Sequence, residues 1–204
     1  MKNTATILLA LLGWFSVVTQ LYLMMENRVT PVGETIVRFF SYFTILTNTL
    51  VALYFTSSWM GIKQGGSKLF KNPGAFTAIT TYITVVGLTY QILLRHTWQP
   101  TGLQLVVDEL LHTIIPVLVI IFWYVYANKS KLMYKQIINW LIYPLIYLVF
   151  VLARGALSDF YPYPFIDVGN LGWVKVFANS FVLIIFFMAL SATFVWIGGA
   201  LNRK

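Results

Sequence analysis

Apolar residues along the chain are gathered into runs of about 20, separated by short segments that hold most of the charged residues, glycines and prolines. A helix rises about 1.5 Å per residue, so about 20 apolar residues cross the hydrocarbon core of a bilayer. This pattern predicts an all-α protein, an integral membrane bundle of six transmembrane helices in a single domain over residues 1–204. The six predicted spans are about 6–25, 35–57, 74–94, 103–127, 136–153 and 173–201.

The second predicted span carries polar groups at helical spacing. Ser41, Thr44, Thr47 and Asn48 lie three, three and one residues apart in an otherwise apolar segment. On one helix, this spacing puts them roughly on one face. Polar groups in hydrocarbon tend to face the interior of a bundle, where they find partners. We therefore expect this face to point inward and to meet polar groups from other spans.

Composition supports a membrane protein and excludes several kinds of site. Hydrophobic residues make up 59% of the chain and charged residues 10%, against roughly 25% charged residues in a soluble domain. The chain has no cysteine, which excludes disulfides, thiolate catalysis and cysteine-ligated metal. A catalytic zinc normally has three protein ligands, and one histidine inside a span with two carboxylates nearby is a poor match to such a ligand set. We expect neither a metal nor an organic cofactor.

The net charge of +8 is explained by where the charges lie, and it does not indicate nucleic acid binding. Nine of the 14 Lys and Arg residues fall on one predicted side without an acidic residue, and the other five share the opposite side with all six acidic residues. The positive-inside rule then predicts that both termini are cytoplasmic, and a basic surface there favours anionic lipid headgroups. The nine basic residues are Lys2, Lys63, Lys68, Lys71, Lys129, Lys131, Lys135, Arg203 and Lys204.

The candidate chemistry lies in the second and fourth spans. His112 is about nine residues from the outer end of its span, a depth of roughly 13 Å, and Thr44 is about as deep in its own span. A hydroxyl beside an imidazole is the minimum for nucleophilic acyl transfer, in which the imidazole takes the hydroxyl proton. Asp108 precedes His112 by one helical turn and would tune it electrostatically, although a side chain on the same helix is an awkward orienter.

These residues also have a structural interpretation. Thr, Ser and Asn in membrane helices often bond to the backbone or bridge helices, and a lone histidine inside a span is often a satisfied structural group. The chain contains no Gly-x-Ser-x-Gly and no His-Glu-x-x-His motif. The pattern alone therefore favours the structural interpretation over catalysis.

The last outer segment, 154–172, is rich in aromatic residues and prolines, which predicts an ordered cap rather than a flexible linker. In the functional interpretation it is a lid-like loop over the outer mouth of the bundle, with Arg154 or Asp167 contributing to the site. In the structural interpretation it is an aromatic belt at the membrane interface with surface charges, which is favoured for each individual residue.

Three short motifs occur in an order that resembles a known family. They are Ser41-Tyr-Phe-Thr44, His112-Thr-Ile-Ile-Pro116 and Tyr163-Pro-Phe-Ile-Asp167. Together they resemble the androgen-induced and androgen-dependent TFPI-regulating membrane proteins and their bacterial six-helix relatives. The flanking sequence is closer to the bacterial relatives, which implies a bacterial cytoplasmic membrane.

The characterised animal members of that family are threonine hydrolases that cleave fatty acid esters of hydroxy fatty acids. The resemblance implies Thr44 as the nucleophile and His112 as its base, the same pair that their equal depth selects. Thr47, one turn deeper, is a fallback nucleophile. The acid of the third motif is Asp167, where animal members tend to carry Glu, so the charge is kept and the reach is shorter.

The resulting hypothesis is an intramembrane, serine-hydrolase-like esterase that acts on membrane lipids or a lipid ester, through a site open towards the outer face. Asn48, Tyr163 and Arg154 are candidate oxyanion donors by residue type. The alternative is a non-catalytic membrane protein that binds a lipid or small molecule. A transporter is a further alternative, but the chain shows no detectable repeat and no helix broken by paired Gly and Pro.

Overall fold

The computed structural model describes residues 1–61, 70, 72 and 74–202, and every regular element in these residues is a helix. The all-α prediction is therefore confirmed. The contacts within the chain form two compact units, Met1–Lys131 and Leu132–Lys204. Five of the basic residues predicted to be cytoplasmic, at positions 63, 68, 71, 203 and 204, lie outside the described residues.

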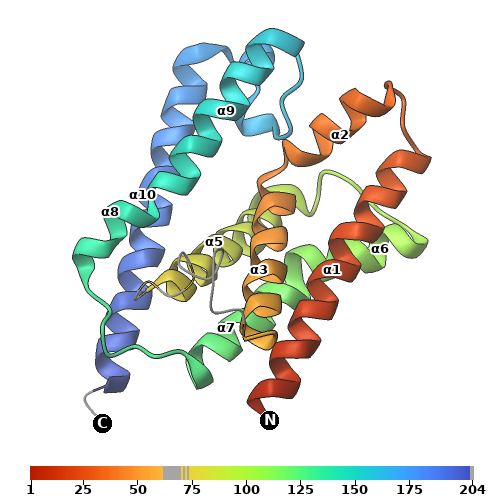
Figure 1. The fold of residues 1–204 in the computed structure, drawn as a ribbon. Coiled ribbons are helices and arrows are strands. Elements are labelled where there is room, and N and C mark those ends of the chain that lie inside the picture. The colour runs from red at the N-terminus through yellow and green to blue at the C-terminus, as the bar shows by residue number, and fades with distance from the viewer. Residues whose placement is uncertain (62–69, 71, 73, 203–204) are drawn as a thin grey trace. The chain divides into compact units, whose positions relative to one another are not determined.

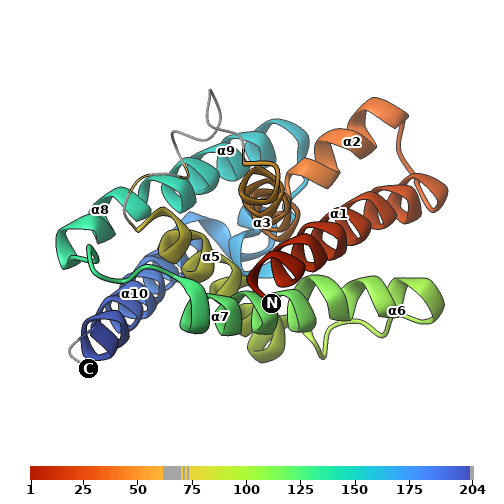
Figure 2. The same ribbon diagram turned by 60° about the horizontal axis from the view of Figure 1, so that its bottom comes forward.

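The first unit is built from helices on either side of the long helix α3. Its helices are α1 (Lys2–Glu26), α2 (Val32–Phe40), α3 (Phe43–Trp59), α5 (Ala75–Thr89), α6 (Gly102–Glu109) and α7 (Ile115–Tyr126). Two π-helical turns continue these helices, Tyr90–Leu94 at the end of α5 and Leu110–Ile114 between α6 and α7. Helix α1 runs beside α3 (Figure 1) and along α6 and α7 (Figure 2).

Small residues let α1 and α3 approach closely. A Cβ atom added at Gly13 would lie 2.9 Å from the Cβ of Ala52, so the two backbones are nearly in contact there. Close by, the indole of Trp14 donates to the hydroxyl oxygen of Thr56 over 3.0 Å. In a bilayer, where lipid tails are as apolar as the helices, small residues and interhelical hydrogen bonds hold helices together. This contact fixes α3 against the first helix.

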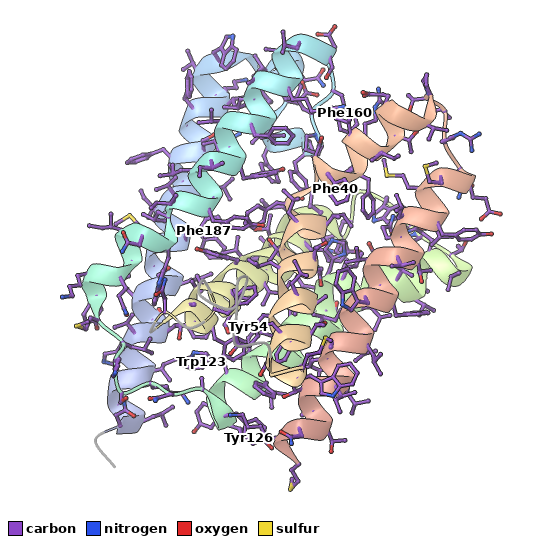
Figure 3. The ribbon with its side chains drawn as sticks, viewed as in Figure 1. Phe40, Tyr54, Trp123, Tyr126, Phe160 and Phe187 are labelled. Atoms are coloured by element: carbon purple, nitrogen blue, oxygen red, sulfur yellow. The ribbon has the colours of Figure 1, made fainter. Side chains whose placement is uncertain are left out.

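Aromatic side chains pack the end of α3 that lies away from α2. Tyr54 stacks on Phe76, with ring centroids 4.5 Å apart, and the indole of Trp123 donates to the Thr77 hydroxyl oxygen over 2.8 Å. Figure 3 shows Tyr54 and Trp123 at this end and Phe40 at the other. These contacts join α3, α5 and α7, and so hold the scaffold on which the polar residues lie.

The second predicted span is not one helix. Helices α2 and α3 are separated by Ser41 and Tyr42, and their axes are bent by 73°. The Ser41 hydroxyl donates to the Val37 carbonyl over 2.7 Å, and Tyr42 has an extended backbone. A serine that bonds back to the carbonyl four residues earlier tends to bend a helix. The prediction of one continuous helix over 35–57 is therefore wrong, and Ser41 lies at the break instead of sharing a helical face with Thr44.

Helices long and apolar enough to cross a membrane make up most of the described chain. There are five such segments, or six if α2 and α3 together count as one span. The five are Lys2–Glu26, Ala75–Leu94, Gly102–Tyr126, Tyr134–Ser158 and Val168–Asn202. Large apolar side chains such as Phe15, Val149 and Phe181 are exposed along them, as expected of helices that face lipid.

The second unit contains α8 (Ile137–Trp140), α9 (Ile142–Ser158) and α10 (Val168–Asn202). Helices α9 and α10 run antiparallel to one another (Figure 1). Because α9 continues to Ser158 and α10 begins at residue 168, the connection between them is shorter than the predicted 154–172. Helix α10 is kinked at Gly172, whose φ of 74° lies in the region that glycine adopts without steric cost.

Candidate active site

The position of His112 depends on Pro116, four residues later. Proline has no N–H, and its ring clashes with the carbonyl of the residue four positions before it. The chain avoids this clash by passing through the π turn Leu110–Ile114, a feature found frequently at functional sites. Gly87 on α5 makes room for it, since a Cβ there would lie 3.1 Å from the Pro116 Cβ and 3.2 Å from the His112 carbonyl oxygen.

Asn48 joins α3 to this π turn. Its Nδ2 donates to the Thr44 carbonyl over 2.9 Å and to the Leu111 carbonyl over 3.2 Å. The Leu111 carbonyl needs such a donor, because in the π register its backbone donor would be Pro116, which has no N–H. The bond places the first turn of α3, which carries Thr44, against the residue before His112.

The two candidate segments therefore meet, but for a different reason from the one predicted. The prediction counted residues inward along a straight second span, whereas Thr44 lies in the first turn of α3, directly after the bend. Thr44 is 8% exposed, while Thr47 and Asn48 are fully buried. Of the two threonines, Thr44 is the more exposed.

Asp108 holds one ring nitrogen of His112. The Nδ1 atom lies 3.2 Å from Asp108 Oδ1 and 3.0 Å from the Asp108 backbone oxygen. Both neighbours are acceptors, so Nδ1 carries a proton, and in a neutral imidazole Nε2 then holds the lone pair. The side chain of Asp108 is only 3% exposed. A carboxylate that the sequence analysis judged an awkward orienter thus lies within hydrogen-bonding distance.

Tyr90 completes this cluster, and the sequence analysis missed it. It opens the π turn at the end of α5, and its hydroxyl donates to Asp108 Oδ2. Its ring stacks on the His112 ring, with centroids 4.1 Å apart and planes 13° from parallel. Tyr90 is 4% exposed. The signal in the sequence is weak, because a tyrosine in an apolar span is usually a core or interfacial residue.

A second set of contacts joins the same two helices nearer the surface. Arg95 forms an ion pair with Glu109, and its guanidinium donates to Gln91 Oε1 over 2.9 Å. Gln91 in turn donates to the Thr113 hydroxyl oxygen over 2.8 Å. The end of α5 is thereby held against the helix that carries Asp108 and His112.

The cluster does not form a set of metal ligands. The carboxylates nearest His112 are engaged, Asp108 with Tyr90 and Glu109 with Arg95. Within the part of the chain that the structure describes, no group of three or more His, Cys, Asp or Glu side chains is placed to hold a metal ion.

Arg154 and Tyr163 lie in the second unit and make contacts within it. The Arg154 guanidinium donates to the Phe160 carbonyl over 3.3 Å and lies over the Phe160 ring, 4.8 Å from its centroid. Tyr163 stacks on Phe165 at 5.2 Å between centroids. Both side chains make contacts within the connection between α9 and α10, and the ordered cap stays a prediction.

Asp167 caps the turn that opens α10. Its Oδ1 accepts the Asn170 backbone N–H over 3.1 Å, and its Oδ2 accepts the Asn170 amide over 2.6 Å. Burial, with a smaller effect from the carboxylates of Asp167 and Asp159, raises the pKa of the Tyr161 phenol. The capping bond gives Asp167 a structural role, and its part in a site stays a prediction.

Comparisons with protein-family models, curated proteins and solved structures gave no match. The family resemblance drawn from the three motifs therefore stays a prediction. The chemistry has to be argued from the first unit itself, where His112 is oriented by Asp108 and the residue before it accepts a hydrogen bond from Asn48, one turn after Thr44 on α3.

Proposed function

We propose that this protein is an intramembrane, serine-hydrolase-like esterase that hydrolyses lipid esters such as fatty acid esters of hydroxy fatty acids. Thr44 is the nucleophile and His112 its base. The observation that carries the proposal is the 3.2 Å approach of Asp108 Oδ1 to His112 Nδ1, next to the turn of α3 that contains Thr44. A base oriented by a third group, near a hydroxyl, is the arrangement that activates a nucleophile.

In the proposed reaction, His112 Nε2 takes the Thr44 proton as the hydroxyl oxygen attacks the ester carbonyl. The tetrahedral intermediate collapses, the bond to the alcohol breaks, and His112 returns the proton to the leaving alcohol. Water then attacks the acyl-threonine while His112 takes a proton from it, the bond from the acyl carbon to Thr44 Oγ1 breaks, and His112 returns the proton to Thr44 as the fatty acid is released. Asp108 holds Nδ1 and stabilises the imidazolium in both steps.

The residue type of Asn48 suggests an oxyanion donor, but the contacts of its side chain favour a different role. Its amide group donates to the Thr44 and Leu111 carbonyls, and its Oδ1 has no hydrogen-bond partner among the described residues. It therefore offers a substrate or water an acceptor. The positive end of the α3 dipole lies at the bend and favours negative charge there, so it supports an oxyanion on the Thr44 side.

The charge distribution supports a membrane orientation with both termini cytoplasmic. The proposed site opens towards the outer face, and the family resemblance implies a bacterial cytoplasmic membrane. Arg154, Tyr163 and Asp167 are proposed as supporting residues in a cap. The reaction as written draws on side chains and water alone, with membrane lipids or a lipid ester as the partner.

A lipid- or small-molecule-binding protein without catalysis is the second candidate. The 73° break between α2 and α3 and the buried, unpartnered Asn48 Oδ1 favour it, because discontinuous membrane helices bind substrates and ions in transporters. The argument against transport that rested on unbroken helices no longer applies.

The test uses purified protein in nanodiscs, with a branched fatty acid ester and a short-chain chromogenic ester as substrates. Thr44→Ala and His112→Ala are expected to stay folded and lose turnover, while Thr47→Ala keeps it. Thr49→Ala is a matched control, because the Thr49 hydroxyl donates only to a carbonyl of its own helix, over 2.7 Å. Wild-type rates in the Thr44 and His112 variants would refute the mechanism.

Binding of a non-hydrolysable ether analogue separates the two candidates. An esterase with Thr44→Ala keeps its affinity for the analogue, because the lost hydroxyl acts on the reacting carbonyl. A binding protein loses affinity with the same substitution and shows no turnover as wild type.

A further inference from the structure

We infer that Tyr90 is a positioning residue, which fixes both the plane and the tautomer of the His112 imidazole. Its effect on turnover rests on the proposed function, but its effect on the imidazole does not. The inference draws on three contacts within one buried cluster: the Tyr90 hydroxyl on Asp108, the Asp108 carboxylate on His112, and the Tyr90 ring on the His112 ring.

The hydroxyl of Tyr90 fixes the carboxylate. The two oxygens of Asp108 are divided, since Oδ2 accepts the Tyr90 hydroxyl and Oδ1 faces His112 Nδ1. The terminal torsion of an aspartate is broad, so a carboxylate with one anchor turns easily. Tyr90 and Asp108 are both almost fully buried, and an anchor in such surroundings is strong because water does not compete for it. Asp108 is therefore kept as an acceptor for Nδ1.

The ring of Tyr90 fixes the plane of the imidazole. With ring planes only 13° apart, His112 cannot tilt without losing the stacking contact. Stacking alone does not decide which edge of the imidazole faces Asp108, because turning the ring over keeps its plane. The two acceptors at Nδ1 decide that edge. Ring and hydroxyl thus act on different degrees of freedom of the same base.

Tyr90 gives His112 an orienter from a second helix. Asp108 and His112 move together, since both belong to the helix that runs through the second π turn. Tyr90 lies in the π turn that continues α5, and this turn is held to the other helix by the Arg95–Glu109 ion pair and the Gln91–Thr113 hydrogen bond. Contacts from two helices therefore hold the imidazole in place. The contact from Tyr90 restrains His112 relative to a second helix, which Asp108 cannot do because it lies on the same helix as His112.

Histidine NMR tests the inference without any need for activity. The chain has two histidines, so protein labelled with 15N-histidine in nanodiscs gives signals for His96 and His112 that a His96→Gln variant assigns. The nitrogen shifts report which ring nitrogen is protonated when the imidazole is neutral. We expect the Nδ1–H tautomer alone in wild type, a mixture of tautomers in Tyr90→Phe, and in addition a mobile ring in Tyr90→Leu.

The matched control is Tyr54→Phe, which removes a hydroxyl from another stacked tyrosine of the first unit. It is expected to leave the His112 signals unchanged. The inference is overturned if His112 keeps both the wild-type tautomer and an immobile ring in both Tyr90 variants. If the His112 signals change in Tyr90→Leu but not in Tyr90→Phe, the role of the Tyr90 ring is supported and the role of its hydroxyl is overturned.

Kinetics with the chromogenic ester then test the link to turnover. Tyr90→Phe is expected to lower kcat about tenfold with little change in KM, the size expected for one lost hydrogen bond to a charged group that acts in the transition state. An unchanged kcat would overturn this link. If wild type cleaves no ester, the esterase proposal fails while the NMR result still decides the positioning of His112.

Discussion

The hydrogen bond from Asn48 to the Leu111 carbonyl allows a quantitative prediction about stability. The change Asn48→Leu removes the donor and leaves a buried carbonyl that Pro116 cannot serve. A buried acceptor left without a partner costs about 1–3 kcal/mol, and side-chain hydrogen bonds in a membrane protein lie lower, at about 0.6–1.7 kcal/mol. The change also removes the unpartnered Oδ1, whose burial is a cost. We therefore expect the free energy of unfolding to fall by about 1–2 kcal/mol.

The same reasoning predicts that Asn48 and Pro116 are energetically coupled. The change Pro116→Ala supplies a backbone N–H that reaches the Leu111 carbonyl in the π register, so the amide of Asn48 is needed less. In the Pro116→Ala background, Asn48→Leu is expected to cost about 1 kcal/mol less than in wild type. A double-mutant cycle cancels the other effects of each substitution, including the packing of the proline ring on Gly87.

Equilibrium unfolding in mixed micelles, followed by helical circular dichroism, measures the four members of the cycle. Thr49→Val is the matched control, because the Thr49 hydroxyl donates to the Ile45 carbonyl of its own helix. It should change stability by less than about 0.5 kcal/mol and add to Pro116→Ala. If the effects of Asn48→Leu and Pro116→Ala add within about 0.3 kcal/mol, the explanation of this bond is refuted.

Three further predictions concern the second unit. Gly155→Ala would place a Cβ 2.0 Å from Tyr161 Cε1, so overpacking of about 1–3 kcal/mol should outweigh the helix-propensity gain and lower Tm. Gly199→Ala is the control, because a Cβ at Gly199 meets nothing within 4 Å. Equal Tm values for the two variants would contradict this prediction. Asp167→Ala should lower the stability measured by thermal unfolding by about 1 kcal/mol, because the cap is lost, and Asp167→Asn should lower it much less. Two variants that both match wild type would contradict the capping role of Asp167. The pKa of Tyr161 is raised above its ordinary value of 10.0 by burial, then by Asp167 and Asp159, so the folded state holds the phenol proton more tightly; this stabilisation is complete below the unfolded pKa and is lost as the pH rises through the folded one. Unfolding measured at alkaline pH should depend less steeply on pH in Tyr161→Phe, and identical slopes would disprove the assignment.

The sequence by itself determined how much of the chain is helical and roughly where the long helices lie. The predicted fourth span, 103–127, is observed as Gly102–Tyr126. This succeeds because hydrophobic length is summed over about 20 residues, so no single side chain decides it. The prediction for the second span was wrong because a single residue decides the structure there. Ser41 bonds back to Val37, and a hydrophobicity averaged over a whole span does not detect a local break of this kind.

Only the tertiary structure decided which side chains meet. The first turn of α3 lies against the π turn because Asn48 serves the carbonyl that Pro116 leaves unpaired, and Tyr90 reaches Asp108 from another helix. Neither contact is encoded in a periodic pattern. In a bilayer, the faces of a helix that touch lipid and those that touch other helices are both apolar. Hydrophobicity therefore locates the spans, while their rotation and register, and with them the candidate site, are decided by packing and by a few polar contacts.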